Sequence, residues 1–106
     1  MAKITRGSGN VFADLGYKDA EERHTKVRLA VAINRIVERR GLSQARIAAL
    51  LGIGQPKVSA LSNFKLDGFS VERLMTFLTA LDRDVSIVIK RKPRSRPMGR
   101  ISVVAA

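Results

Sequence analysis

The sequence contains no cysteine, no tryptophan and a single histidine, His24. Without thiols and with one imidazole, the chain lacks the usual ligand sets of zinc fingers and iron–sulfur clusters, so we expect no metal site and no cofactor. A catalytic pair of nucleophile and base is equally hard to assemble, which argues against an enzyme. His24 itself is expected to be a solvated surface residue.

Long apolar runs and clustered aromatic residues are also missing. No apolar run approaches the ~20 residues that cross a bilayer, and the start, MAKITRGSGN, lacks the apolar core of a signal peptide. We therefore expect a cytoplasmic protein without membrane contacts. The four Phe and one Tyr are scattered rather than spaced as a stacking platform, which disfavours a reader of single-stranded RNA.

Positive charge is what the sequence has in excess. The 20 Lys and Arg residues oppose 9 Asp and Glu residues, which gives a net charge of +11 in 106 residues. Such a balance indicates a polyanionic partner, and nucleic acid is the first candidate. A chain of this length is expected to form one domain with a modest core, stabilised further by a partner subunit.

Residues 44–61, QARIAALLGIGQPKVSAL, have the pattern of two short helices joined by a tight turn. Apolar residues recur at helical spacing in both halves, so the two helices share one core. Gly52 suits the left-handed end of the first helix, and Pro56 suits the first turn of the second. Ser43 is a good N-cap for the first helix. This spacing predicts a helix-turn-helix.

The second helix of this motif is expected to lie in the major groove of duplex DNA. With Val58 and Leu61 turned inward, its remaining surface is polar and free of carboxylates. Base contacts are expected from Gln55, Lys57, Ser59, Pro56 and Ala60, with Gln55 and Lys57 as the leading readers. Phosphate contacts are expected from Ser43, Gln44, Arg46, Ser62, Asn63 and Lys65.

The flanking segments are predicted as follows. Residues 1–18 form a basic arm and a short helix that ends at Gly16. A long helix starts with a capping box at Asp19 and Glu22 and continues to Gly41. Residues 64–69 form a loop anchored in the core by Phe64 and Phe69. A further helix follows with Ser70 as its N-cap, and Asp82 ends its apolar stripe.

The segment DVSIVIK, residues 84–90, changes to a period of two. Val85, Ile87 and Ile89 share one face, which predicts a β-strand. Because a lone strand has no partner for its backbone groups, we expect it to pair with its copy across a two-fold axis. The resulting homodimer would place two recognition helices about one DNA turn (~34 Å) apart, to match a palindromic operator.

Residues 91–106 are expected to be a basic tail. The run KRKPRSRP has too much charge and proline to pack, so we expect disorder in the free protein. Two roles stay open for it: contact with phosphates or the minor groove of DNA, and a solubilising tail without contacts. Residues 19–90 then form the DNA-binding domain with its dimerisation strand.

The stretch QARIAALLGIGQPKVSALSN resembles the lambda-repressor-like (XRE family) helix-turn-helix. Two segments, GSGNVFADLGYKDAEER and FSVERLMTFLTALDRDVSIVIK, are similar to the HigA-type antitoxin branch of that family. Residues that match the motif are Gln44, Ala48, Leu51, Gly52, Ile53, Gln55, Val58 and Ser59. The chain departs from it at Gly54, where Ser or Thr is usual, and at Asn63-Phe64.

The resemblance implies an all-α bundle of about four to five helices with one C-terminal strand. It also implies a repressor that, as an antitoxin, binds a RelE/HigB-like ribonuclease toxin and represses its own operon. The acidic residues Asp14, Asp19, Glu21 and Glu22 are a candidate surface for that toxin, although carboxylates are also usual near a helix start. The competing hypothesis is a non-specific nucleic-acid-binding protein that uses its basic tail.

Overall fold

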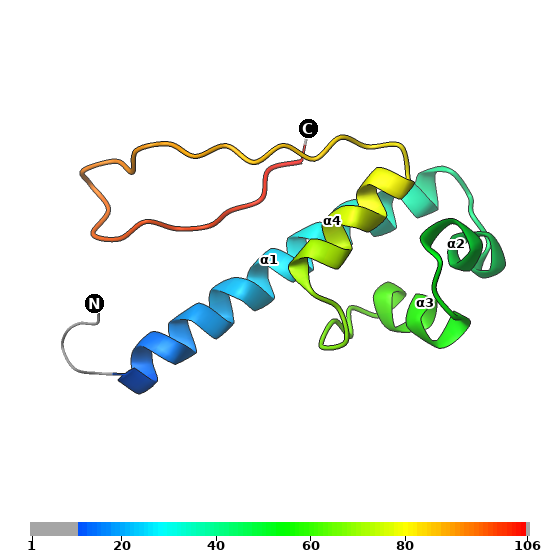
Figure 1. Cartoon of the computed structure of the whole chain (residues 1–106), viewed down its shortest axis with the longest axis horizontal. Helices are drawn as coiled ribbons and strands as arrows, with labels where there is room; N and C mark the ends of the chain where they lie inside the picture. Colours follow the sequence, from blue (N-terminus) through cyan, green and yellow to red (C-terminus); the bar gives the residue numbers. More distant parts are fainter. Residues whose placement is uncertain (1–10, 106) are drawn as a thin grey trace.

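The computed structural model describes residues 11–105, and the predicted basic arm of residues 1–10 lies outside the described residues. The described part contains four helices: α1 (Val11–Arg39), α2 (Gln44–Leu51), α3 (Gln55–Ser62) and α4 (Val71–Ala80). Figure 1 shows α1 as a long rod, with α4 beside its C-terminal half and α2 and α3 at that same end. The all-α class is as predicted. None of the described helices is long and apolar enough to cross a membrane.

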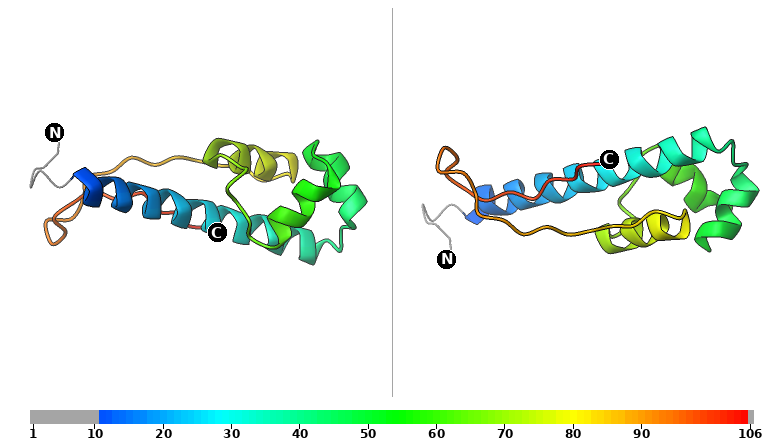
Figure 2. Two further views of the ribbon diagram at one scale, coloured as in Figure 1. Left: turned by 90° about the horizontal axis from the view of Figure 1, so that it is seen from below. Right: turned by 90° about the horizontal axis from the view of Figure 1, so that it is seen from above.

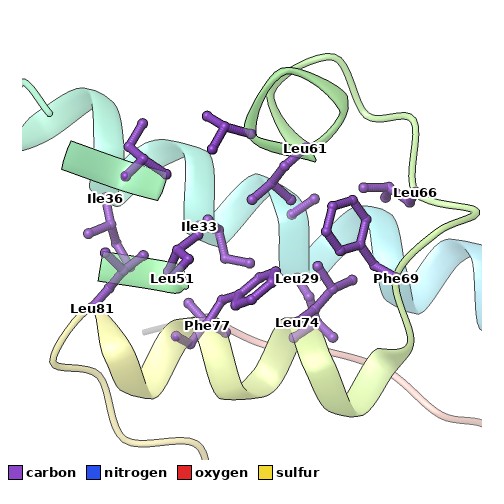
Figure 3. Close-up of a cluster of buried hydrophobic side chains, with 14 residues drawn as sticks. Leu29, Ile33, Ile36, Leu51, Leu61, Leu66, Phe69, Leu74, Phe77 and Leu81 are labelled. Atoms are coloured by element: carbon purple, nitrogen blue, oxygen red, sulfur yellow. The ribbon is translucent and has the colours of Figure 1, made fainter. Parts of the chain in front are cut away.

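The C-terminal half of α1 is the platform on which the other helices pack. Its residues Leu29, Ile33 and Ile36 are buried, as the predicted apolar stripe requires. Figure 3 shows Leu29 and Ile33 near Leu61 from α3 and Phe77 from α4, with Ile36 at the Leu81 end of the same cluster. Burial of a large apolar side chain contributes roughly 1.5–3 kcal/mol. The short helices α2 and α3 therefore depend on this shared core for their stability.

The helix-turn-helix is formed as predicted, by α2, the turn at residues 52–54 and α3. Gly52 has φ 67°, the left-handed conformation that ends a helix at little cost to glycine. The next backbone N–H, that of Ile53, donates to the carbonyl of Ala48 at 3.1 Å and closes the end of α2. Pro56 lies in the first turn of α3, as expected. The turn therefore fixes the direction of α3.

The beginning of α1 differs from the prediction. The helix starts at Val11 and continues through Gly16, so the predicted short helix and the capping box at Asp19 are both wrong. The Asp19 carboxylate accepts a hydrogen bond from the Arg23 side chain at 2.9 Å, and Glu22 pairs with Lys26 at 3.5 Å. These carboxylates thus support the interior of a helix by pairs at i, i+4 instead of starting one.

Phe64 is a second difference. Phe64 is 44% exposed, whereas Phe69 is buried as predicted. Phe64 occupies the left-handed position after α3, with φ 58°. The Lys65 N–H then donates to the Ala60 carbonyl at 2.9 Å, which satisfies one free carbonyl at the end of the helix. The prediction of two core anchors is therefore correct for Phe69 only.

The strand predicted over residues 84–90 is absent from the described single chain, where residues 83–105 contain no helix or strand. The segment is extended, and its backbone groups make no hydrogen bonds to other described residues. Ile87 is 75% exposed and Ile89 is 94% exposed. Pairing in a sheet needs a second strand, so the single chain leaves this edge open.

The C-terminal tail does not stay apart from the domain. Figures 1 and 2 show that the chain after α4 extends beside α1, turns, and returns along α1. On the way back the Ile101 N–H donates to the Glu21 carboxylate at 3.3 Å. The Arg28 side chain donates to the Val103 carbonyl at 3.4 Å, and Val103 packs against the core. The run KRKPRSRP, which is expected not to pack, is exposed over residues 90–95, whereas Val103 in the apolar end of the chain packs against the core.

The left-handed turn at Gly52 gives a prediction about stability. Nothing lies within 4 Å of a Cβ added at Gly52, so the cost of Gly52→Ala is that of the backbone conformation alone. We expect a loss of about 1 kcal/mol in the free energy of unfolding, measured by chemical denaturation. Gly99→Ala is the matched control because it also meets no atoms and has no left-handed φ. Equal effects of the two substitutions would contradict this account.

Candidate nucleic-acid interface

The first turn of α2 presents polar groups to solvent. Ser43 is its N-cap, and the Ser43 hydroxyl oxygen accepts a hydrogen bond from the Arg46 N–H at 3.1 Å. Gln44 and Arg46 are exposed in that same turn. The first turn of α2 contains no acidic residue. Free backbone N–H groups and a nearby guanidinium therefore make this turn suitable for a phosphate.

The exposed face of α3 is polar and small. Gln55, Pro56 and Ser59 are exposed, and Ala60 is half-buried beside them. The opposite face is fixed by Val58 and Leu61, which are buried in the core. Since α3 contains no carboxylate, nothing on it repels a polyanion. A face of this shape fits the major groove of duplex DNA.

The end of α3 keeps its polar side chains at the surface. Ser62, Asn63 and Lys65 are all exposed. The Asn63 amide donates to the Ser59 carbonyl at 2.9 Å and so caps its own helix. This bond uses one donor of the amide, and the Asn63 carbonyl oxygen takes no part in it. Lys65 follows the exposed ring of Phe64 in the loop.

Lys57 is placed differently from the other predicted base readers. It is exposed as a residue, but its ammonium donates to the Gly68 carbonyl at 3.0 Å. The same ammonium lies 4.9 Å from the centroid of the Phe69 ring. The structure therefore brings Gln55, Ser59 and Ala60 together on one face, while the Lys57 ammonium contacts the loop after α3.

Two residues of this region were not predicted from the sequence. Asn34 of α1 donates its side-chain amide to the Leu61 carbonyl at 3.2 Å and ties the last turn of α3 to α1. The sequence signal for Asn34 is a polar residue inside the apolar stripe of a helix, where a buried partner is expected. Arg73 of α4 lines a hollow together with Lys57, Ile53 and Phe69. No sequence pattern indicates this neighbourhood, because its residues come from the turn before α3, from α3, from the loop after it and from α4.

Comparison with known proteins agrees with this geometry. A family model described as a helix-turn-helix domain matches residues 11–90. A solved structure named "Putative XRE Family Transcriptional Regulator" is 70% identical, with a TM-score of 0.80. The match covers 83% of this chain and 99% of that one. A search of curated proteins returned no match.

The fold and its exposed helix define a helix-turn-helix protein of the DNA-binding class. Because the family model matches most of the chain, the chain belongs to this helix-turn-helix domain family. Within that class, the chain is similar to a solved structure whose title names an XRE family transcriptional regulator.

Two serine caps offer a matched test of the α2 turn. Ser43 and Ser70 each accept a hydrogen bond from the backbone N–H three residues later, at 3.1 and 3.0 Å. We expect Ser43→Ala and Ser70→Ala each to lower the free energy of unfolding by about 1 kcal/mol in thermal denaturation. Ser43→Ala should in addition weaken DNA binding more than Ser70→Ala. Equal binding by the two variants would remove Ser43 from the interface.

Proposed function

We propose that this protein is a sequence-specific transcriptional repressor. The observation that carries the proposal is the exposed, carboxylate-free face of α3 beside the first turn of α2. On α3, Gln55, Pro56, Ser59 and Ala60 face the bases. Phosphates are held by Ser43, Gln44, Arg46, Ser62, Asn63 and Lys65.

Binding as a homodimer completes the proposal. The extended segment 84–90 leaves its backbone unpaired among the described residues, and its apolar side chains Ile87 and Ile89 are exposed. Antiparallel pairing with the same segment of a second chain would satisfy both the backbone and the side chains. The two copies of α3 would then contact a palindromic operator about one helical turn (~34 Å) apart.

The proposal is tested with duplexes selected from a random library, in fluorescence anisotropy across a salt series. Preference for the selected duplex over a shuffled one at physiological salt supports a specific regulator. Equal and steeply salt-dependent binding to both favours the second candidate, a non-specific nucleic-acid binder. The observation behind that candidate is the exposed basic run at residues 90–95.

Replacing Gln55 or Gln44 by alanine removes the same amide from a predicted base reader and from a predicted phosphate contact. Gln55→Ala should cost about 1–3 kcal/mol on the selected duplex and relax the preference at one base position. Gln44→Ala removes the same amide near a phosphate and should weaken binding equally across sequences. Anisotropy on a panel of single-base variants separates the two outcomes. A uniform loss for Gln55→Ala would contradict its role as a reader.

Neighbouring positions of the 84–90 segment test the dimer. Ile87→Asp puts a charge on the face shared by Val85, Ile87 and Ile89, so we expect monomers by light scattering. Ser86→Asp puts the same charge on the opposite face and should leave dimers. Dimers of unchanged stability for Ile87→Asp would refute strand pairing.

An antitoxin role is the narrower form of the proposal. Asp19, Glu21 and Glu22 gather in the N-terminal half of α1, in a chain that is otherwise strongly basic. A basic partner, such as a RelE/HigB-like toxin, would fit this surface by charge. Co-expression with the product of the adjacent reading frame should yield a complex that Asp19→Lys with Glu22→Lys weakens. A complex that these substitutions leave unchanged would place the toxin elsewhere.

A further inference from the structure

Lys57 lies in the first turn of α3, yet its ammonium is bound within the protein. The Nζ donates to the Gly68 carbonyl at 3.0 Å and lies 4.9 Å from the Phe69 ring centroid. Both partners belong to the far end of the loop that leads to α4. To reach a base, the ammonium must give up a hydrogen bond and a cation–π contact together.

Phe69 extends this connection to α4. Its buried ring meets Phe77 of α4 edge-to-face, with ring centroids 5.8 Å apart and planes at 78°. The Arg73 guanidinium lies over the Phe77 ring at 5.3 Å. Lys57, Phe69, Phe77 and Arg73 thus form a continuous cation–aromatic stack from α3 to α4. Edge-to-face rings and cations over rings are both attractive arrangements.

The stack supplies a side-chain tie at the first turn of α3, in addition to the backbone turn and the buried Val58. The last turn of α3 is fixed by the bond from Asn34 to the Leu61 carbonyl. Its first turn has Gly54 as N-cap, without a side-chain hydrogen bond. The Lys57 contacts act on that first turn, and together the two ties fix both ends of an eight-residue helix.

We infer that Lys57 is a positioning residue, which sets the angle of α3 against α4 through Gly68 and Phe69 and does not read a base. The inference deepens the proposed function and rests on it, since the angle matters only if α3 enters the groove. Loss of the tie should tilt every contact of α3 at once. A reader of one base would lose discrimination at one position.

Gly68 allows the tie to be loosened without a change in charge. A Cβ added there would lie 3.1 Å from the Lys57 Nζ, so the ammonium must shift by a few tenths of an ångström or more. Gly68 has no left-handed φ, and therefore alanine adds no backbone strain. Gly68→Ala and Lys57→Met thus each disturb the contact between the Lys57 ammonium and Gly68, one by changing the acceptor residue and the other by removing the donor.

The first test is binding of the full chain to the selected duplex and its single-base variants across a salt series. We expect Lys57→Met to weaken all duplexes by about three- to tenfold, with the salt slope kept. Gly68→Ala should give a smaller loss of the same uniform kind, and Lys57→Arg, which keeps the cation, should restore most of the affinity. Selective loss at one base pair, or a salt slope reduced by about one, would overturn the inference in favour of a base or phosphate contact.

The second test does not need DNA. Urea unfolding of Lys57→Met, Gly68→Ala and the double variant should show coupling, with the double variant less destabilised than the sum of the single ones. Additive losses of unfolding free energy would show that Lys57 and Gly68 are not coupled and would overturn the inference. If the wild type shows no preferred duplex, the proposed function fails, and with it the positioning role, whereas coupling would still identify the tie.

Discussion

The buried face of α1 is the constraint on which the remaining structure depends. α3 has eight residues, fewer than an isolated helix needs to persist in water. It exists because Val58 and Leu61 enter the core that Leu29 and Ile33 provide, and because Asn34 holds its last turn. A surface that is to meet a rigid duplex must itself be held rigidly, and α1 supplies that support.

Local chemistry explains which parts of the fold could be predicted from the sequence. Ser43, Ser70 and Gly52 act within one turn of their own positions, and each has the predicted role. The start of α1 could not be predicted in this way. Carboxylates such as Asp19 and Glu22 are common at a helix start, but they also form i, i+4 pairs inside a helix, as they do here. Phe64 violates the rule that glycine takes the left-handed position, so no local pattern could reveal it.

Contacts between distant segments explain the rest. The exposed residues on α3 follow from helical periodicity, and the structure places Gln55 and Ser59 as that periodicity requires. The engagement of Lys57 joins α3 to a loop eleven residues later, and the Val103 contact with Arg28 spans 75 residues. The periodicity of the sequence carries no information about contacts between residues so far apart in the chain. The period of two in segment 84–90 predicted a strand, but the described single chain holds no second strand for it to pair with.

In the proposed complex, α3 and the first turn of α2 form the DNA surface. The most direct measurement is an NMR titration of the labelled protein with the selected duplex, followed through its backbone amide signals. We expect the largest shifts at residues 43–46 and 54–65, with small changes along the returning segment 99–105. Shifts concentrated in residues 90–100, with α3 unchanged, would contradict the account and make the basic run the binding element.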